Sequence, residues 1–266
     1  MTFNDILYDK QDGIATITIN RPKVLNAFRS QTVDEMVAAF QDAWADRTIG
    51  VVILTGVGDR AFSTGGDQSG RESGGYQGKA TRSDTGLDIE DLHSIIREIP
   101  KPVIAAVNGY AIGGGHVLHF LCDLTIAADT ARFGQVGPRV GSVDPGFGTA
   151  YLTRVVGEKK AREIWYLCRQ YSAAEAEAMG LVNKVVPAAE LMNEARAWAR
   201  EILDKSPTAI KIAKASFNAE TDHIRGISAL GMTSLALYYA TEEAMEGRNA
   251  FIEKRKPDFR KYRRSP

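Results

Sequence analysis

Two glycine-rich turns, each following an apolar run, carry the groups best suited to chemistry in this chain. The first turn is Gly65-Gly66, within AFSTGGDQ, after the run Val51 to Leu54. The second is Gly113-Gly114-Gly115, after the run Val103 to Val107, and it opens a predicted helix from His116 to Leu121. The first amides of a helix have no partner inside it and carry the positive end of its dipole. Two converging turns can therefore form an oxyanion hole, although either turn alone is equally consistent with close packing.

The segments GDRAFSTGGDQ and KPVIAAVNGYAIGGGHVLHFLCDLTIAAD closely resemble the crotonase (enoyl-CoA hydratase/isomerase) superfamily, and the resemblance covers essentially the whole chain. It implies an acyl-CoA thioester substrate and an oxyanion hole made by the amides of Gly66 and Gly114. It implies an α/β fold: a spiral core of ββα turns over residues 1–205 and an all-helical extension over 206–266, through which a homotrimer or homohexamer forms. The further substrate contacts that it implies are Thr64, Gly65, Asp67, Gln68, Tyr110 and Gly113.

The resemblance leaves the reaction open, because one fold supports many reactions. Hydratases of the superfamily use two glutamates, and the matching positions here are Val117 and Gly137. Neither side chain can transfer a proton. Simple hydration by that mechanism is therefore not expected.

The loop GSVDPG supplies other polar groups. This loop, the segment EKKAREIWYLCRQYSA and the ending EEAMEGRNAFIEKRKPDF resemble two branches of the superfamily, the 1,4-dihydroxy-2-naphthoyl-CoA synthases and the 2-ketocyclohexanecarboxyl-CoA hydrolases. Each branch makes or breaks a carbon–carbon bond beside a thioester enolate. The resemblance assigns an acyl-pocket serine to Ser142, an acid/base carboxylate to Asp144, a hydroxyl to Tyr239, a lid tyrosine to Tyr76 and a CoA contact to Lys254.

In some synthases a bicarbonate ion replaces a missing carboxylate base. Its pocket maps to Gln135, Val136, Gly137 and Trp165, although Val136 stands where those synthases have a threonine. No prosthetic group is implied.

Details of the motifs favour the ring-opening hydrolase, which forms pimeloyl-CoA, over the ring-closing synthase of menaquinone biosynthesis. Ser69 replaces the lysine of the synthase lid, Arg71 is retained, and Leu25 stands at a basic or polar CoA position. The helix GISALGMTSLALYY also resembles the hydrolase. A catalytically silent acyl-CoA-binding protein is a remote alternative, against which the neutral charge and the retained Asp144 argue. Taken singly, Asp144 could be a turn residue and Tyr239 a core aromatic.

The pattern of the chain predicts the elements that position these groups. Ile14 to Asn20 and Val51 to Leu54 are predicted strands, joined by an amphipathic helix from Thr32, so they should pair in parallel. Gln68 to Leu87 lacks periodicity and is interpreted as a lid, with featureless disorder as the alternative. Phe133 to Gly148 is expected to be irregular. The other predicted elements are a strand at Leu124 to Ala128, one at Leu181 to Val186, and helices at Asp91 to Glu98, from Glu158, at Ala173 to Met179, at Ala188 to Asp204, at Thr208 to Asn218, at Ile224 to Ala244 and near Asn249 to Lys254.

Composition limits the partners. The 266 residues include 33 basic and 33 acidic side chains, which argues against general nucleic-acid or acidic-membrane binding. Cys122 and Cys168 are expected to be reduced core residues, and His116 with His119 gives two ligands without a third, so no metal site is expected. With no signal peptide and no apolar run near 20 residues, a cytoplasmic protein is expected.

Overall fold

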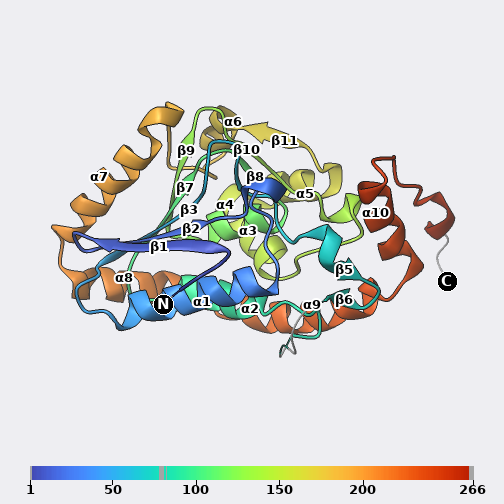
Figure 1. The fold of residues 1–266 in the computed structure, drawn as a ribbon, viewed down its shortest axis with the longest axis horizontal. Helices are drawn as coiled ribbons and strands as arrows, with labels where there is room; N and C mark the ends of the chain where they lie inside the picture. Colours follow the sequence, from blue (N-terminus) through green and yellow to red (C-terminus); the bar gives the residue numbers. More distant parts are fainter. Residues whose placement is uncertain (1, 78–80, 82, 264–266) are drawn as a thin grey trace.

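The computed structural model describes residues 2–77, 81 and 83–263, and its centre is a six-stranded sheet (Figure 1). The strand order is β1-β2-β3-β7-β9-β12. Within this sheet only the β1–β2 pair is antiparallel, and the predicted parallel pairing of β2 with β3 is confirmed. The strands are β1 (Ile6–Gln11), β2 (Ile14–Ile19), β3 (Val51–Gly56), β7 (Val103–Val107), β9 (Leu124–Ala128) and β12 (Lys184–Val186).

A second sheet continues the chain from the ends of the first. Its order is β11-β10-β8-β4, from β4 (Ala61–Ser63), β8 (Tyr110–Ile112), β10 (Arg132–Gly134) and β11 (Gln170–Ser172). The strands β4, β8 and β10 directly follow β3, β7 and β9, so a long strand and a short one recur three times. Three residues are too few to show alternation, and for that reason the pattern of the sequence did not reveal the short strands.

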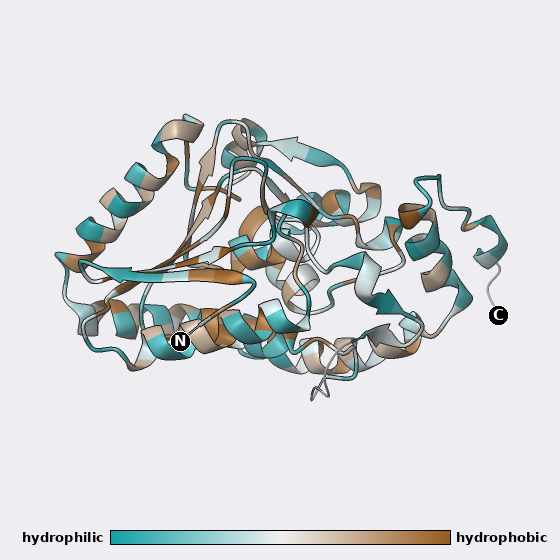
Figure 2. Cartoon of the chain, in the orientation of Figure 1, coloured by the Kyte–Doolittle hydropathy of each residue, from teal (hydrophilic) through white to brown (hydrophobic). Residues whose placement is uncertain are grey.

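Helices cover both faces of the large sheet. The main core lies between the sheet and α1 (Ser30–Ala45), α2 (Ile89–Glu98) and α3 (Gly114–Leu121), whereas a smaller apolar cluster joins the other face to α7 (Leu191–Leu203). Figure 2 shows hydrophobic residues along the inner strands and alternating hydrophilic and hydrophobic residues along α7. The remaining core helices are α4 (Leu152–Val156), α5 (Glu158–Leu167) and α6 (Ala173–Ala178), with single turns η1 (Pro22–Val24) and η5 (Ala188–Glu190).

The C-terminal part is helical, as predicted, with α8 (Pro207–Ala219), α9 (Ile224–Tyr239), α10 (Glu242–Ile252) and the turn η6 (Arg260–Tyr262). Ser206 caps α8 by accepting a hydrogen bond from the Ala209 amide. The prediction of one helix from Ile224 to Ala244 is wrong, because Thr241 accepts from the Ala244 amide and begins a new helix. The division into two domains stays a prediction. In the described ranges no helix is long and apolar enough to cross a bilayer.

Two segments predicted to lack regular structure contain short elements. The lid segment holds η2 (Gln68–Gly70) and a hairpin of β5 (Arg71–Glu72) and β6 (Gly75–Tyr76), and part of it lies outside the described residues. The segment from Phe133 contains the end of β10, the turn η3 (Gly137–Arg139) and the start of a π-helical turn, η4 (Phe147–Tyr151). These pieces are too short to produce periodicity in the sequence.

Candidate active site

The two glycine turns meet at the ends of β4 and β8. The Phe28 amide donates to the Gly65 carbonyl and the Asp67 amide donates to the Phe28 carbonyl, both at 2.8 Å. This parallel bridge directs the intervening Gly66 N–H away from Phe28. Gly114 is the first residue of α3, so its N–H is one of the unpartnered first-turn amides.

The approach of these turns requires glycine. A Cβ on Gly65 would lie 2.7 Å from the Gly114 nitrogen, and a Cβ on Gly114 would lie 2.6 Å from the Phe28 ring. Gly65 also has φ +85°, which L side chains rarely adopt. The structure therefore packs the turn that carries Gly66 against the turn that carries Gly114, and their role as an oxyanion hole stays a prediction.

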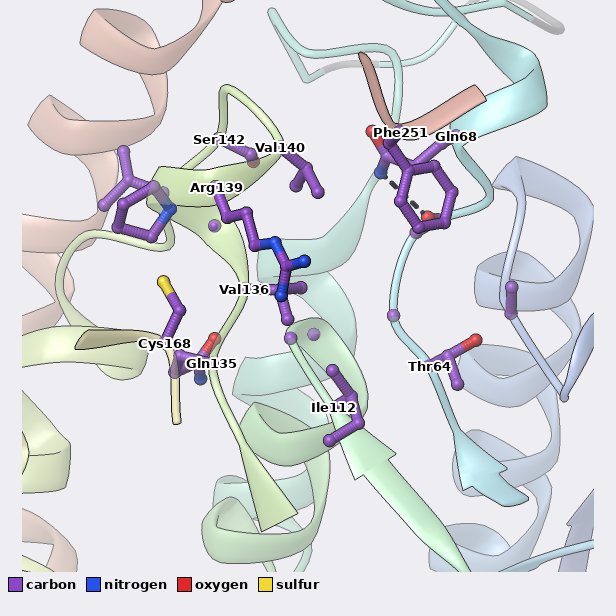
Figure 3. A pocket seen from close by; sticks show the side chains of 18 of the residues that line it. Thr64, Gln68, Ile112, Gln135, Val136, Arg139, Val140, Ser142, Cys168 and Phe251 are labelled. Atoms are coloured by element: carbon purple, nitrogen blue, oxygen red, sulfur yellow. Dashed lines mark hydrogen bonds between the residues drawn. The ribbon is translucent and has the colours of Figure 1, made fainter. Parts of the chain in front are cut away.

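Both turns open into a cleft of about 2230 Å³. In Figure 3, Thr64 and Gln68 lie on one wall, while Val136, Arg139 and Ser142 lie on the other. Apolar side chains also line the cleft, at Leu87, Ile89, Val143, Met232 and Leu235. The lining thus combines polar groups with apolar surface that suits a hydrocarbon group.

Ser142 and Tyr239 form a hydrogen-bonded pair in the lining of the cleft. Ser142 Oγ and Tyr239 Oη are 2.7 Å apart, and either can donate. The Ser142 amide donates to the Gly137 carbonyl at 2.8 Å, which fixes the serine after η3. Tyr239 is the last residue of α9 and is 3% exposed. These two residues, 97 positions apart, can together hold one oxygen of a ligand.

Asp144 lies between η3 and the π-helical turn, on the wall of the same cleft. Its Oδ1 accepts a hydrogen bond of 3.1 Å from the Gly148 amide. Burial raises the pKa of Asp144 to about 7, the Gly148 amide opposes the rise, and Glu90 adds to it. A carboxyl group with such a pKa can both accept and return a proton near neutral pH.

The lid hairpin brings Tyr76 to the glycine turns. A Cβ on Gly66 would clash with the Tyr76 hydroxyl, so the phenol is in direct contact with that glycine. Gln68 Nε2 donates to the Gly66 carbonyl at 3.0 Å and to Tyr76 Oη at 3.3 Å. Burial, followed by the nearby Tyr239, raises the pKa of Tyr76. Tyr76 is therefore a neutral hydroxyl beside the Gly65-Gly66 turn.

The other predicted substrate contacts line the same cleft: Thr64, Gly65, Asp67, Gln68, Tyr110, Gly113 and Lys254. Asp67 is engaged within the protein, since it pairs with Arg21 at 3.1 Å and accepts from Ser69. Although burial opposes the change, these hydrogen bonds lower the pKa of Asp67. Asp67 therefore stabilises the turn, and its carboxylate is already engaged within the protein. Lys254 follows α10 and has φ +54°.

Gln135 and Trp165, two of the residues predicted to bind bicarbonate, differ in whether their hydrogen-bond donor already has a partner. Gln135 is 1% exposed, and its Nε2 has no hydrogen-bond partner within the described part of the chain. The Trp165 indole N–H instead donates to the Gly148 carbonyl at 2.7 Å. A Cβ on Gly137 would lie 2.6 Å from the Ser142 carbonyl oxygen and 2.9 Å from the Trp165 ring. Gln135 fits an anion or a carbonyl group, whereas the space beside Gly137 is filled.

The side chains of Val117, His116 and His119 all lie inside the core. Val117 is fully buried, and His116 and His119 are stacked with His116 Nδ1 and His119 Nε2 3.0 Å apart. Among the residues that the structure covers, no group of three metal-binding side chains occurs. The prediction that Cys168 is a core residue is wrong, because it ends α5 with φ +49° and lies on the cleft wall.

Sequence reasoning assigned no role to Arg71. This arginine is 1% exposed and donates to the carbonyl oxygens of Val140 and Gly141 at 2.7 and 2.8 Å. A charged residue in a segment without periodicity gives no sign of burial, so no pattern in the sequence could have shown its contacts. The apolar side chains of Leu87 and Ile89 were missed as part of the lining because they lie at the end of the same segment, which has no periodicity.

Comparisons with known proteins identify the family and agree with the fold. The model of the enoyl-CoA hydratase/isomerase family matches residues 9–262. The chain is similar to an enoyl-CoA hydratase from Mycobacterium avium subsp. paratuberculosis K-10, with 28% identity, a TM-score of 0.85, and coverage of 97% of this chain and 99% of the other. It is also similar to Pseudomonas aeruginosa OdaA, with 31% identity, a TM-score of 0.83, and coverage of 93% and 98%. A monofunctional enoyl CoA isomerase from M. smegmatis has 32% identity, a TM-score of 0.70, and coverage of 82% and 94%.

Proposed function

The chain belongs to the enoyl-CoA hydratase/isomerase family, and on that premise we propose that it hydrolytically opens the ring of 2-ketocyclohexanecarboxyl-CoA to give pimeloyl-CoA. The observation that carries the proposal is the position of Asp144 and the Ser142–Tyr239 pair on the same cleft as the Gly66 and Gly114 turns. The positions of the two hydratase glutamates hold a buried valine and a glycine without space for a side chain. Carbon–carbon bond chemistry therefore fits the available groups better than hydration.

The proposed reaction begins with Asp144 as the base. Its carboxylate takes a proton from water, and the water oxygen adds to the ring ketone carbon, whose oxygen is held by Ser142 and Tyr239. The bond between this carbon and the carbon next to the thioester then breaks, and its electron pair forms a thioester enolate. The amides of Gly66 and Gly114 stabilise the enolate oxygen. Protonation of the enolate carbon through Asp144 completes the reaction, which consumes one water.

The pKa of Asp144 supports this dual use. A group that is to accept a proton in one step and return it in the next works best when its pKa is near the working pH. Burial places the pKa of Asp144 at about 7. An ordinary surface aspartate would be a much weaker base.

A specific observation favours the second candidate, 1,4-dihydroxy-2-naphthoyl-CoA synthase. The unpartnered Gln135 Nε2, buried at the cleft wall, is a donor that a bicarbonate ion could use. Bicarbonate would supply a base for removing the proton beside the thioester. The filled space at Gly137 and the engaged Trp165 argue against this use, and the hydrolase remains our first proposal.

We also propose that the protein is a homotrimer or a dimer of trimers in solution. The C-terminal helices expose large apolar side chains, among them Phe217 at 78%, Leu230 at 73% and Leu237 at 72%. Exposed apolar groups at this density are typical of surfaces that other chains cover. Light scattering coupled to size-exclusion chromatography tests the proposal, and a monomer at micromolar concentration would contradict it.

Mass spectrometry of the purified protein with each substrate distinguishes the two reactions. A product heavier by one water from 2-ketocyclohexanecarboxyl-CoA establishes the hydrolase. Loss of one water from o-succinylbenzoyl-CoA establishes the synthase and refutes our first proposal. Each incubation is run with and without bicarbonate, because a rate that depends on bicarbonate would support an anion site in the cleft.

A further inference from the structure

Arg71 is a buried cation without a counter-ion. Its guanidinium donates three hydrogen bonds to backbone carbonyls, at 2.8 Å to Gly141, 2.7 Å to Val140 and 3.3 Å to Ala244. In the part of the chain that the structure describes, no carboxylate pairs with it. Carbonyl dipoles satisfy its donors but do not cancel its charge, so a full positive charge remains inside the site wall.

The charge of Arg71 faces a residue of the candidate active site. The guanidinium carbon lies 4.7 Å from the centre of the Tyr239 ring, within the range of a cation–π interaction. The hydroxyl of the same tyrosine is 2.7 Å from Ser142 Oγ. Burial strengthens such electrostatic interactions because little water screens them.

The lid hairpin of β5 and β6 contains Arg71 and also contacts Tyr239. Arg71 is paired with Tyr76 in the two-stranded hairpin, and the amide of Gly74 at its turn donates to the Tyr239 carbonyl at 3.3 Å. Val140 and Gly141, which Arg71 binds, directly precede Ser142. The same arginine thus contacts the segment that carries the serine and the helix end that carries the tyrosine.

The proposed reaction creates negative charge on two different oxygens. The glycine amides serve the thioester oxygen, but the oxygen of the ring ketone also becomes an alkoxide when water adds to its carbon. Two neutral hydroxyls alone stabilise an alkoxide less well than donors that act beside a buried cation. We propose that Ser142, Tyr239 and Arg71 form a second oxyanion site, in which Arg71 is a positioning residue that acts through Tyr239 on the alkoxide of the ring ketone.

This inference rests on the proposed function, and a double-mutant cycle tests it. The variants are Arg71→Met, Arg71→Lys, Tyr239→Phe and the double variant Arg71→Met/Tyr239→Phe. Arg97→Met is the matched control, because Arg97 is also buried, at 4% exposure, and also lies over aromatic rings, at 5.4 Å from Phe147 and 4.5 Å from Tyr151. It lines no part of the described cleft.

We expect Arg71→Met to lower kcat on the order of 100-fold, as loss of an oxyanion donor does, with KM changed less than about 3-fold. Arg71→Lys keeps the charge and should recover part of the loss. In the Tyr239→Phe background, the same Arg71→Met change should cost less than about 3-fold, because its route to the substrate is gone. Arg97→Met should lower the melting temperature with little change in kcat.

Three results would overturn the inference. These are an equal cost of Arg71→Met in both backgrounds, a loss confined to KM, and a kcat loss from Arg97→Met of the same size. Circular dichroism and the Kd for cyclohexanecarboxyl-CoA identify any variant that fails to fold, and Arg71→Lys then carries the test. If the wild type acts only on o-succinylbenzoyl-CoA, the ring-opening function fails, but the cycle is run on that substrate, whose ring closure also forms a tetrahedral alkoxide. A wild type inactive on both substrates refutes both proposals.

Discussion

Replacing Asp144 by asparagine tests the mechanism through two independent quantities. The side chain keeps its shape and its acceptor oxygen for the Gly148 amide, but it can no longer take a proton from water. We expect a 100- to 10,000-fold loss of kcat, the usual size of a general acid–base contribution. Binding of the CoA ester should change little, because the glycine turns and the apolar lining are untouched.

The pH dependence of the wild type follows from the raised pKa. If Asp144 is the base, kcat/KM should increase about tenfold per pH unit below pH 7 and level off above it, because only the carboxylate can accept the proton. The residual activity of Asp144→Asn should lack this dependence. The assay is loss of the β-keto thioester followed by mass spectrometry between pH 5 and pH 9.

The second quantity is the free energy of unfolding, which should fall as the pH rises through 7, whereas the activity should rise. Burial raises the pKa of Asp144 from 3.8 to about 7, so the folded protein binds this proton more tightly than the unfolded chain does. The resulting stability is complete below about pH 4 and is lost as the pH rises through 7. At ~1.4 kcal/mol per tenfold change in binding, the ceiling is about 4 kcal/mol, and partial access of cleft water reduces our expectation to about 1–2 kcal/mol.

Asparagine carries no charge, so Asp144→Asn should equal the wild type near pH 4 and exceed it by that amount at pH 8, measured by urea unfolding. A stability difference that does not vary with pH would refute the raised pKa. Activity near that of the wild type would remove Asp144 from the mechanism. Asp129→Asn, outside the cleft lining, is the control for a general effect of removing a carboxylate.

Three further substitutions test the packing of the site and its support. Gly114→Ala places a Cβ 2.6 Å from the Phe28 ring, so we expect at least 100-fold lower kcat with a smaller change in Kd, measured by steady-state kinetics and calorimetry. Gly137→Ala meets a loop carbonyl at 2.6 Å and should destabilise the protein by about 1–3 kcal/mol in urea unfolding; an unchanged midpoint would contradict the packing. Lys214→Met leaves the Asp123 carboxylate, now 2.6 Å from the ammonium, without its cation; because Lys214 is buried but the Asp123 side chain is 29% exposed, we expect about 1–2 kcal/mol of destabilisation, partly restored by adding Asp123→Asn.

The sequence predicted the strands β2, β3, β7 and β9 and the two glycine turns because each has a strong local signal. The equally long β1 was missed, because this edge strand is mostly exposed and polar. The run Val103 to Val107 is wholly apolar, and the structure shows it as fully buried β7. The start of α8 was also predictable, since Ser206 before a proline is a capping signal that acts over four residues. The bends within the last helices were less accessible, because a single threonine at position 241 ends one helical pattern and begins another.

The site was predictable only where a motif fixes it. Gly66, Gly114 and Asp144 come from segments that resemble the family, and the structure brings them to one cleft. Arg71 and the apolar side chains at Leu87 and Ile89 depend on contacts with distant parts of the chain. Burial of an arginine by three carbonyl groups is a tertiary property, and neither composition nor periodicity carries information about it.

The contacts of Arg71 also bear on when the protein becomes competent during its synthesis. Its bond to the Ala244 carbonyl spans 173 positions, and the Ser142–Tyr239 bond spans 97. A ribosome releases the two glycine turns early, whereas the tyrosine and the Ala244 carbonyl emerge almost at the end. A nascent chain can therefore fold much of its sheet core before Tyr239 and the Ala244 carbonyl are available to complete the site. On the proposed mechanism, activity therefore requires α9 and α10 to be docked.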